Sequence, residues 1–277
     1  MPDMTRIDYA SLADEIAQWL RFQMNQSGAT RLVLGLSGGI DSAVVCALST
    51  MAAGPLRVVA AIMPIHSRPE DMRDAELVAN AFEVVPRAID LAPAYDALVA
   101  AMPDDSASGL EDANVDPDTR AMRRQLALAN AKPRLRMTAL YYLGNRYNGL
   151  VVGTGNKTEL NIGYFTKYGD GGVDLLPLGD LDKTAVRGLA RELGIPEPVI
   201  IKAPSAGLWE GQTDEAELGV TYEELDRALT VAAGDVSEGS IDPVTMNRVS
   251  ALVAATEHKR QAIPVFRRNA ASVITTR

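Results

Sequence analysis

The stretch Arg31-Leu-Val-Leu-Gly-Leu-Ser-Gly-Gly-Ile-Asp-Ser42 decides the interpretation of this sequence. Its first residues are mostly apolar and short enough for a buried strand, and an apolar helix follows from about Asp41. The glycines between them let the backbone turn sharply and bring its N–H groups close to an anion. Because the N-terminus of the following helix adds donors and a favourable dipole, we predict a phosphate-binding loop at this junction.

Asp41 is an unexpected residue in a phosphate-binding loop, because its carboxylate repels an anion. A divalent cation resolves the conflict if Asp41 holds Mg²⁺ and Mg²⁺ in turn holds phosphate. The usual P-loop ends in Gly-Lys-Ser or Gly-Lys-Thr, and no lysine lies between Gly35 and Ser42. The pattern is not Gly-x-Gly-x-x-Gly either, which argues against a dehydrogenase. The plain alternative is a glycine-rich turn that only joins a strand to a helix.

Predicted strands and helices alternate on both sides of this loop. Further strands are predicted at 56–63, 87–91 and 150–154, and helices at 11–24, 69–82, 93–102, 182–193 and 242–256. A capping box at Thr221-Tyr-Glu-Glu224 opens another helix. Pro133 predicts a break or a new start in the long helical region after residue 118. This order predicts an α/β fold with a doubly wound, Rossmann-like parallel sheet and helices on both faces. We expect a single domain over residues 1–277, with its core at about 11–266.

We predict two mobile segments. Residues 103–118 are rich in Asp, Ser, Ala and Gly, which indicates a solvated connection. Residues 205–219 carry Gly207, Gly211 and Gly219 among mostly polar residues, so they form either a lid or an ordinary surface loop.

The composition excludes several classes of function. The chain has 277 residues, a net charge of −9 and one cysteine, Cys46, which we expect to be a small core residue. An acidic surface does not attract nucleic acid or anionic lipid. No apolar run approaches the roughly 18–20 residues of a membrane span, and the N-terminus lacks the pattern of a signal peptide. We therefore expect a cytoplasmic protein that binds neither nucleic acid nor membrane.

A second motif follows the strand predicted at 150–154. It reads Gly153-Thr-Gly-Asn-Lys-Thr-Glu159 and then Gly163-Tyr-Phe-Thr-Lys-Tyr-Gly-Asp170. The loop at 35–42 resembles the pyrophosphate loop of the N-type ATP pyrophosphatases, a superfamily of adenine nucleotide alpha hydrolase-like enzymes, but does not choose among them. The second motif resembles that of the NAD synthetases in particular. This resemblance extends from about Leu32 to Phe266.

The resemblance implies an ATP-consuming ligase that makes NAD from deamido-NAD and ammonia, the last step of NAD biosynthesis. ATP would adenylate the nicotinate carboxylate, with release of pyrophosphate and then AMP. It also implies a homodimer and a lid at 205–219. Some NAD synthetases carry a glutamine-hydrolysing domain with a catalytic cysteine. Here the match begins near Leu32 and Cys46 lies in the helix after the phosphate loop, so free ammonia is the expected donor.

The resemblance also assigns site residues. For the ATP phosphates it indicates the whole loop, that is Gly35, Leu36, Ser37, Gly38, Gly39, Ile40, Asp41 and Ser42. Further ATP contacts would come from Thr154, Lys183 and Ser205. Mg²⁺ would be held by Asp41 and Glu159, and the catalytic set would be Asp41, Lys183 and Asp174. Deamido-NAD would be bound, in part across the dimer, by Arg134, Lys167, Asp174, His258 and Lys259. Arg136 lies two residues from Arg134, and Pro133 departs locally from the family pattern.

The residue chemistry agrees with these roles. Adenylation brings a carboxylate and a phosphate together, and Mg²⁺ with Lys183 would offset the repulsion and stabilise the departing pyrophosphate. Lys167 and Lys259 suit the phosphates of a dinucleotide, although each alone could be a solvated surface residue. His66 follows a strand end, where it lies either near the adenine or in a polar loop without ligand contact.

Two other classes remain open at this stage. One is another N-type ATP pyrophosphatase, such as a tRNA-modifying enzyme, but those commonly use catalytic cysteines and a basic RNA surface. The other is a non-catalytic ATP-binding module. Such a module gives no reason for Asp41, Glu159 and Lys183 to occur together.

Overall fold

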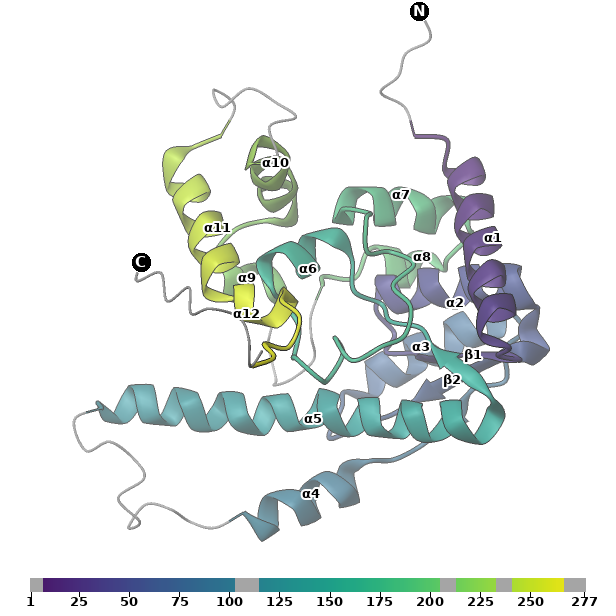
Figure 1. Cartoon of the computed structure of the whole chain (residues 1–277), viewed down its shortest axis with the longest axis horizontal. Helices are drawn as coiled ribbons and strands as arrows, with labels where there is room; N and C mark the ends of the chain where they lie inside the picture. The colour runs from purple at the N-terminus through teal and green to yellow at the C-terminus, as the bar shows by residue number, and fades with distance from the viewer. Residues whose placement is uncertain (1–6, 103–114, 205–212, 233–240, 267–277) are drawn as a thin grey trace, which may run out of the picture.

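The computed structural model describes residues 7–102, 115–204, 213–232 and 241–266 (Figure 1). Its centre is a parallel sheet in the order β3 (Arg87–Ala88), β2 (Val58–Ile62), β1 (Arg31–Gly35) and β4 (Gly149–Val151). A single bridge between Val152 and Leu175 extends the pairing beyond β4. The predicted α/β class is thus confirmed, although β3 has only two residues.

Helices cover both faces of the sheet. On one face lie α1 (Tyr9–Ser27), α2 (Ile40–Ala53), α3 (Pro69–Ala81), α7 (Lys183–Glu192) and α8 (Glu197–Ile200), which share one large apolar core with residues such as Leu32 and Leu34. On the other face α5 (Pro117–Tyr147) packs on Val33, Val59 and Ala61 through Leu143. Successive strand residues point to opposite faces, so each short strand contributes to both cores. A short 3-10 helix, η1 (Pro55–Arg57), precedes β2.

A further layer follows in the second half of the chain. It consists of α6 (Lys157–Ile162), α9 (Asp214–Leu218), α10 (Tyr222–Ala232), α11 (Pro243–Ala255) and α12 (Glu257–Arg260). These helices have their own apolar cluster, which includes Ile162, Leu225 and Val249. Figure 1 shows α10 and α11 standing apart from the sheet, with α6 and α12 between them and α5. The predicted capping box holds at α10, because Thr221 N donates to Glu224 Oε2 at 2.8 Å and Glu224 N to Thr221 Oγ1 at 3.2 Å.

The predicted break at Pro133 is wrong, because α5 is one continuous helix through that residue. Proline removes a single backbone donor, and a long helix tolerates this loss when the ring is packed. Pro133 is buried, and a Cβ placed on Gly169 would lie 3.0 Å from its Cβ. Packing against the segment that holds Gly169 therefore keeps the helix intact.

Other boundaries also differ from the sequence predictions. α1 begins at Tyr9 and ends at Ser27, whereas the predicted helix was 11–24; its buried residues are Ala13, Ala17, Leu20 and Met24. Residues 103–114 and 205–212 lie outside the described part of the chain, but Pro117 already belongs to α5 and Asp214–Leu218 form α9. The C-terminal ends of both predicted mobile segments are therefore helical.

Cys46 is buried as expected, and burial raises the pKa of its thiol to about 12.

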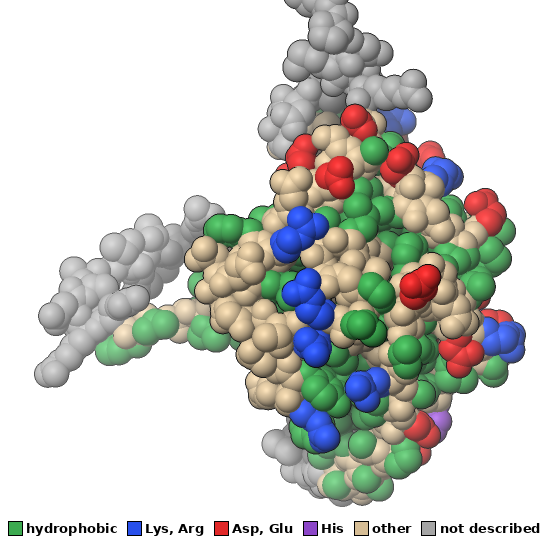
Figure 2. All heavy atoms as spheres, turned by 90° about the vertical axis from the view of Figure 1, so that its right-hand side faces the viewer, with side chains coloured by type: hydrophobic (Ala, Val, Ile, Leu, Met, Phe, Trp, Pro, Cys, Tyr) green, Lys and Arg blue, Asp and Glu red, His purple; other side chains and the backbone are tan. Residues whose placement is uncertain are grey.

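The surface is less uniform than a net charge of −9 suggests. Figure 2 shows one face on which basic side chains form a row between apolar patches, while acidic side chains gather at the top and along one edge. Within the part of the chain that the structure describes, no helix is both long and apolar enough to cross a membrane.

Candidate active site

A cavity of about 400 Å³ opens at the carboxyl ends of β1 and β2. Its walls come from the phosphate loop, from α5, from the segment 163–173 and from Lys202–Pro204. In open parallel sheets ligands bind outside the carboxyl ends of the strands, at the point where the strand order reverses, and in this sheet that point lies between β1 and β4. The cavity therefore lies where the sequence placed the phosphate site.

The phosphate loop is held by its own serines. Ser42 Oγ donates to Gly39 O at 2.8 Å and accepts from Ser37 N at 3.2 Å. Gly38 has a φ of +81°, and a Cβ at this position would lie 2.3 Å from Asp71 O in α3. A side chain at residue 38 is thus excluded both by the backbone conformation and by the neighbouring helix.

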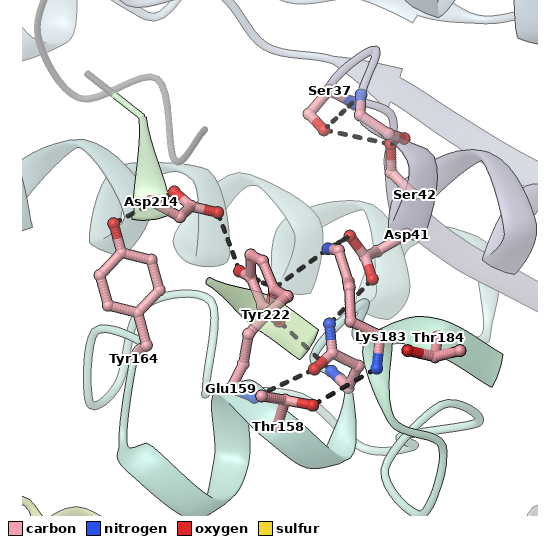
Figure 3. A network of polar contacts seen from close by, with 12 residues as sticks. Ser37, Asp41, Ser42, Thr158, Glu159, Tyr164, Lys183, Thr184, Asp214 and Tyr222 are labelled. Atoms are coloured by element: carbon pink, nitrogen blue, oxygen red, sulfur yellow. Dashed lines mark hydrogen bonds and ion pairs between the residues drawn. The ribbon is translucent and has the colours of Figure 1, made fainter. Parts of the chain in front are cut away.

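Lys183 is the central charge of the site (Figure 3). Its side chain is almost fully buried, and its Nζ lies 2.5 Å from Asp41 Oδ2 and 3.6 Å from Glu159 Oε1. The Tyr222 ring lies beneath the ammonium group, with 4.8 Å between Nζ and the ring centroid. Asn156 Nδ2 donates to Asp41 Oδ1 at 3.0 Å, which orients this carboxylate from its other side. Residues from α2, α6, α7 and α10 therefore meet at one point.

The charges in this cluster do not balance. Burial raises the pKa of Glu159 to about 8, and the nearby negative charge of Asp41 contributes to the rise. Burial alone would lower the pKa of Lys183, but the charges of Asp41 and Glu159 raise it overall, so the ammonium form is kept. A second positive charge beside these carboxylates would stabilise both in their ionised form.

The two carboxylates fit a magnesium ion that is shared with phosphate. Among the described residues, no group of three or more His, Cys, Asp and Glu side chains is arranged to hold a metal. Mg²⁺ commonly takes only one or two protein carboxylates and fills its other positions with water and substrate phosphates. Asp41 and Glu159, both within 3.6 Å of Lys183 Nζ and both lining the cavity, supply that kind of donor set.

A tyrosine–carboxylate network supports the cluster from behind. Tyr222 is buried, its hydroxyl donates to Asp214 Oδ2 at 2.9 Å, and Glu159 Oε1 lies 3.5 Å away. Tyr164 Oη lies 3.1 Å from Asp214 Oδ1 and 2.8 Å from Glu217 Oε2. Burial, followed by the charges of Glu159 and Asp214, raises the pKa of Tyr222, so its hydroxyl stays a donor. The network ties α9 to the lysine site.

Comparison with known proteins identifies the family of the chain. The family model of NAD synthase matches residues 12–263. The chain belongs to the NAD synthase family. An NH(3)-dependent NAD(+) synthetase of Carboxydothermus hydrogenoformans is 48% identical over 83% of this chain and 88% of that protein. Among solved structures, an NMN synthetase from Francisella tularensis is similar with a TM-score of 0.80 and 34% identity, over 94% of this chain and 99% of the other. An NH3-dependent NAD synthetase from Campylobacter jejuni has a TM-score of 0.76 and 25% identity, over 95% of this chain and all of its own.

The residues expected to bind ATP and metal lie together. Besides the loop, the lining of the cavity includes Thr154, Glu159 and Lys183. Ser205 lies outside the described residues. For His66 the sequence allows either a contact with the adenine or a position in a polar loop. Its side chain is exposed, its Nε2 lies 2.7 Å from Asp96 Oδ1, and the residue does not line the cavity.

Most of the residues expected to bind deamido-NAD lie outside the cavity lining. Lys167 Nζ donates to His258 O at 2.6 Å, and Arg134 reaches Lys167 O at 3.4 Å. Lys259 Nζ donates to Gly163 O and Phe165 O at 2.8 Å each and lines the cavity. These contacts join α5, the segment around residue 165 and α12.

Asp174 has a clear local function in this structure. Its carboxylate accepts from Val151 N at 2.8 Å and from Tyr141 Oη at 2.9 Å, so it fastens its segment to β4 and α5. The cavity lining contains its neighbours Gly172 and Val173, but not Asp174. Its predicted catalytic role is not tested by this geometry.

Several side chains in the site had received no role from the sequence. They are Asn156, Tyr222, Asp214 and Arg136. Asn156 could have been suspected, because it precedes Glu159 by three residues in a capping box that fixes both side chains. Tyr222 carries no such signal, since its burial beneath Lys183 depends on how α10 packs on α7.

Proposed function

We propose that this chain is an ammonia-dependent NAD synthetase, a ligase that forms NAD from deamido-NAD, ATP and ammonia with release of AMP and pyrophosphate. Family membership supports this function, and one observation carries the chemistry. Lys183, Asp41 and Glu159 converge beside a loop built to bind phosphate. Cations are needed there because a carboxylate must attack a phosphate that is itself negative.

Different residues of the site have different roles in the proposed reaction. The backbone and serines of residues 35–42 bind the phosphates of ATP, and Lys183 lies ready to donate to an oxygen of the departing pyrophosphate. Asp41 and Glu159 would hold Mg²⁺, which would neutralise phosphate charge and orient the leaving group. Asn156 and Tyr222 keep the two carboxylates and the lysine in register. Ammonia then attacks the acyl adenylate and AMP leaves.

The test is a product assay with Mg²⁺, ATP and deamido-NAD, in which ammonium or glutamine serves as nitrogen donor. We expect AMP and NAD in equal amounts with ammonium, and no NAD with glutamine alone. AMP without NAD would keep the adenylation and overturn the substrate, as expected for another ATP pyrophosphatase. No AMP at all would leave only the ATP-binding module.

One observation makes a second substrate worth testing. The NMN synthetase from Francisella tularensis shares the fold with a TM-score of 0.80 and 34% identity. An NMN synthetase makes a mononucleotide, whereas an NAD synthetase makes a dinucleotide. The same assay with nicotinate mononucleotide in place of deamido-NAD separates the two activities. We expect a higher kcat/KM for deamido-NAD.

We also propose that the protein acts as a homodimer in the cytoplasm. Arg134, Lys167 and His258 lie in a group that does not line the ATP cavity. A dinucleotide that reached both regions would remain largely exposed on one chain, and a second copy would enclose it. Exposed apolar side chains on α4 (Ala92–Ala101) and α5, such as Leu98 and Met122, support such a partner.

A further inference from the structure

The cavity contains more positive side chains than the loop chemistry uses. Among the described residues, the cations that line it are Arg68, Arg136, Lys183, Lys202 and Lys259. Most are already engaged. Arg68 and Lys202 both pair with Asp71, and Lys202 also pairs with Asp74. Lys183 pairs with Asp41, and Lys259 donates to two backbone carbonyls.

Arg136 is the exception. Its Nε donates to Met63 O at 3.0 Å, which fixes the side chain at the end of β2. Within the described part of the chain, its two terminal amino groups have no hydrogen bond or ion pair with protein. Burial lowers the pKa of Arg136, while the more distant charges of Asp170 and Asp71 oppose this effect. A guanidinium that is fixed, largely withdrawn from water and unpaired on two of its nitrogens is a strong site for an oxyanion.

The position of Arg136 places this site beside the phosphate loop. A Cβ built on Gly35 would lie 3.3 Å from the Met63 side chain and 3.7 Å from Leu140. Met63 supplies the carbonyl that holds Arg136, and Leu140 lies one helical turn further along the same face of α5. The start of the loop and the guanidinium therefore lie on neighbouring parts of one wall.

We propose that Arg136 is a substrate-binding residue whose guanidinium takes an oxyanion, phosphate or carboxylate, of the nucleotides that react in this cavity. The inference rests on the proposed function for the identity of these nucleotides. Arg136 then provides a second positive group in the cavity, with a role different from that of Lys183. Lys183 faces the carboxylates that would hold a metal, whereas Arg136 is free to bind the substrate directly. Arg134, two residues away, points elsewhere and contacts Lys167 O.

The experiment compares R136Q and R136K with the wild type, and uses R124Q as the matched control. Arg124 is an exposed residue on the same helix, so R124Q removes the same charge away from the cavity. Dissociation constants are measured separately for ATP with Mg²⁺ and for deamido-NAD by titration calorimetry. We expect R136Q to weaken one of the two nucleotides by about 10- to 100-fold, as for loss of a charge-assisted hydrogen bond. R136K should fall between, because it keeps the charge but loses the fork geometry.

The arms of this experiment identify the source of the oxyanion. Weaker ATP binding assigns a phosphate of ATP, and weaker deamido-NAD binding assigns an anionic group of that nucleotide. Unchanged affinity for both in R136Q overturns the proposal. A purely structural role would lower the melting temperature of the free protein and leave both affinities intact, which also overturns it. If R136Q does not fold, the affinities of R136K decide by the same criteria. Failure of the wild type to make NAD would refute the proposed function, while the affinity for ATP would still test Arg136.

Discussion

At the scale of single residues, Lys183 serves two purposes that can be separated. It pairs with Asp41 and lies near Glu159 in the free protein, and we propose that it donates to the leaving pyrophosphate. Without this lysine the two carboxylates would face each other with no positive side chain between them. Binding of a divalent cation would replace it electrostatically, but would not replace a donor aimed at the phosphate.

We expect K183M to lower kcat for AMP formation by about 100- to 1,000-fold, the usual loss when one stabilising donor of a transition state is removed. Its melting temperature should fall, and Mg²⁺ should restore part of the loss because it can pair with the carboxylates left behind. Quench-flow measurement of AMP and a melting curve with and without Mg²⁺ check both points. The control is K157M, because Lys157 is an exposed lysine at the start of α6 that pairs with Asp180. K183M with the kcat of the wild type would refute this role.

Asp71 is expected to make the protein less stable as the pH falls into the acid range. Burial acts to raise the pKa of its carboxyl, but the hydrogen bonds and charges of Arg68 and Lys202 lower it overall. Because the folded-state pKa lies below the ordinary value of 3.8, the stabilisation is complete above pH 3.8 and is lost as the pH falls through the folded-state value. D71N should therefore melt lower than the wild type at pH 7, and the difference should shrink below about pH 4. Melting temperatures from pH 7 to pH 3 test this, with D14N as control because Asp14 is an exposed residue of α1. A difference that stays constant down to pH 3 would show that the charge of Asp71 is not the cause.

At the scale of elements, the phosphate loop was predictable because its cause is local. Glycines, a preceding strand and a following helix are all written in one short segment, and the conflict of Asp41 with phosphate is visible there. Arg136 was not predictable in the same way. Residues two apart on a helix point about 200° away from each other, so a shift of two positions decides whether a side chain faces the cavity or the solvent. The continuity of α5 through Pro133 was equally hidden, because it depends on packing against a distant segment.

Gly38 and Gly28 form a matched pair for testing the loop. Both have a left-handed φ, +81° and +70°, but nothing lies within 4 Å of a Cβ on Gly28, whereas one on Gly38 would meet Asp71 O at 2.3 Å. G28A should cost only the left-handed conformation, about 1–2 kcal/mol of unfolding free energy. G38A should cost more and should also weaken ATP binding, because α3 and the loop must move apart. Chemical denaturation and ATP titration of both variants provide the measurement. Equal losses in the two variants, with ATP binding intact, would contradict the tight packing of the loop on α3.

At the scale of the whole molecule, the remaining question is how a long nucleotide is enclosed. The cavity of about 400 Å³ accounts for the phosphate loop and Lys183, but Arg134, Lys167 and His258 lie outside its lining. None of the residues of α4 is buried, although most of them are apolar. An apolar helix that is left exposed favours burial against a second copy of the chain. The sequence could suggest this dimer only by resemblance, since no single-chain pattern encodes it.

We expect the wild type to sediment as a dimer and L98D, with a charge on α4, to shift toward the monomer. Leu98 is 38% exposed, so the free chain tolerates the new charge better than an apolar interface would. If the partner completes the deamido-NAD site, L98D should lose affinity for deamido-NAD while its affinity for ATP stays near that of the wild type, because the phosphate loop belongs to one chain. L56D is the control, since Leu56 is 90% exposed on η1 and stands for an isolated apolar residue. Sedimentation velocity and two separate nucleotide titrations distinguish the outcomes. A monomeric wild type that still binds both nucleotides would refute the homodimer, and a monomeric L98D with unchanged deamido-NAD affinity would show that the site is complete within one chain.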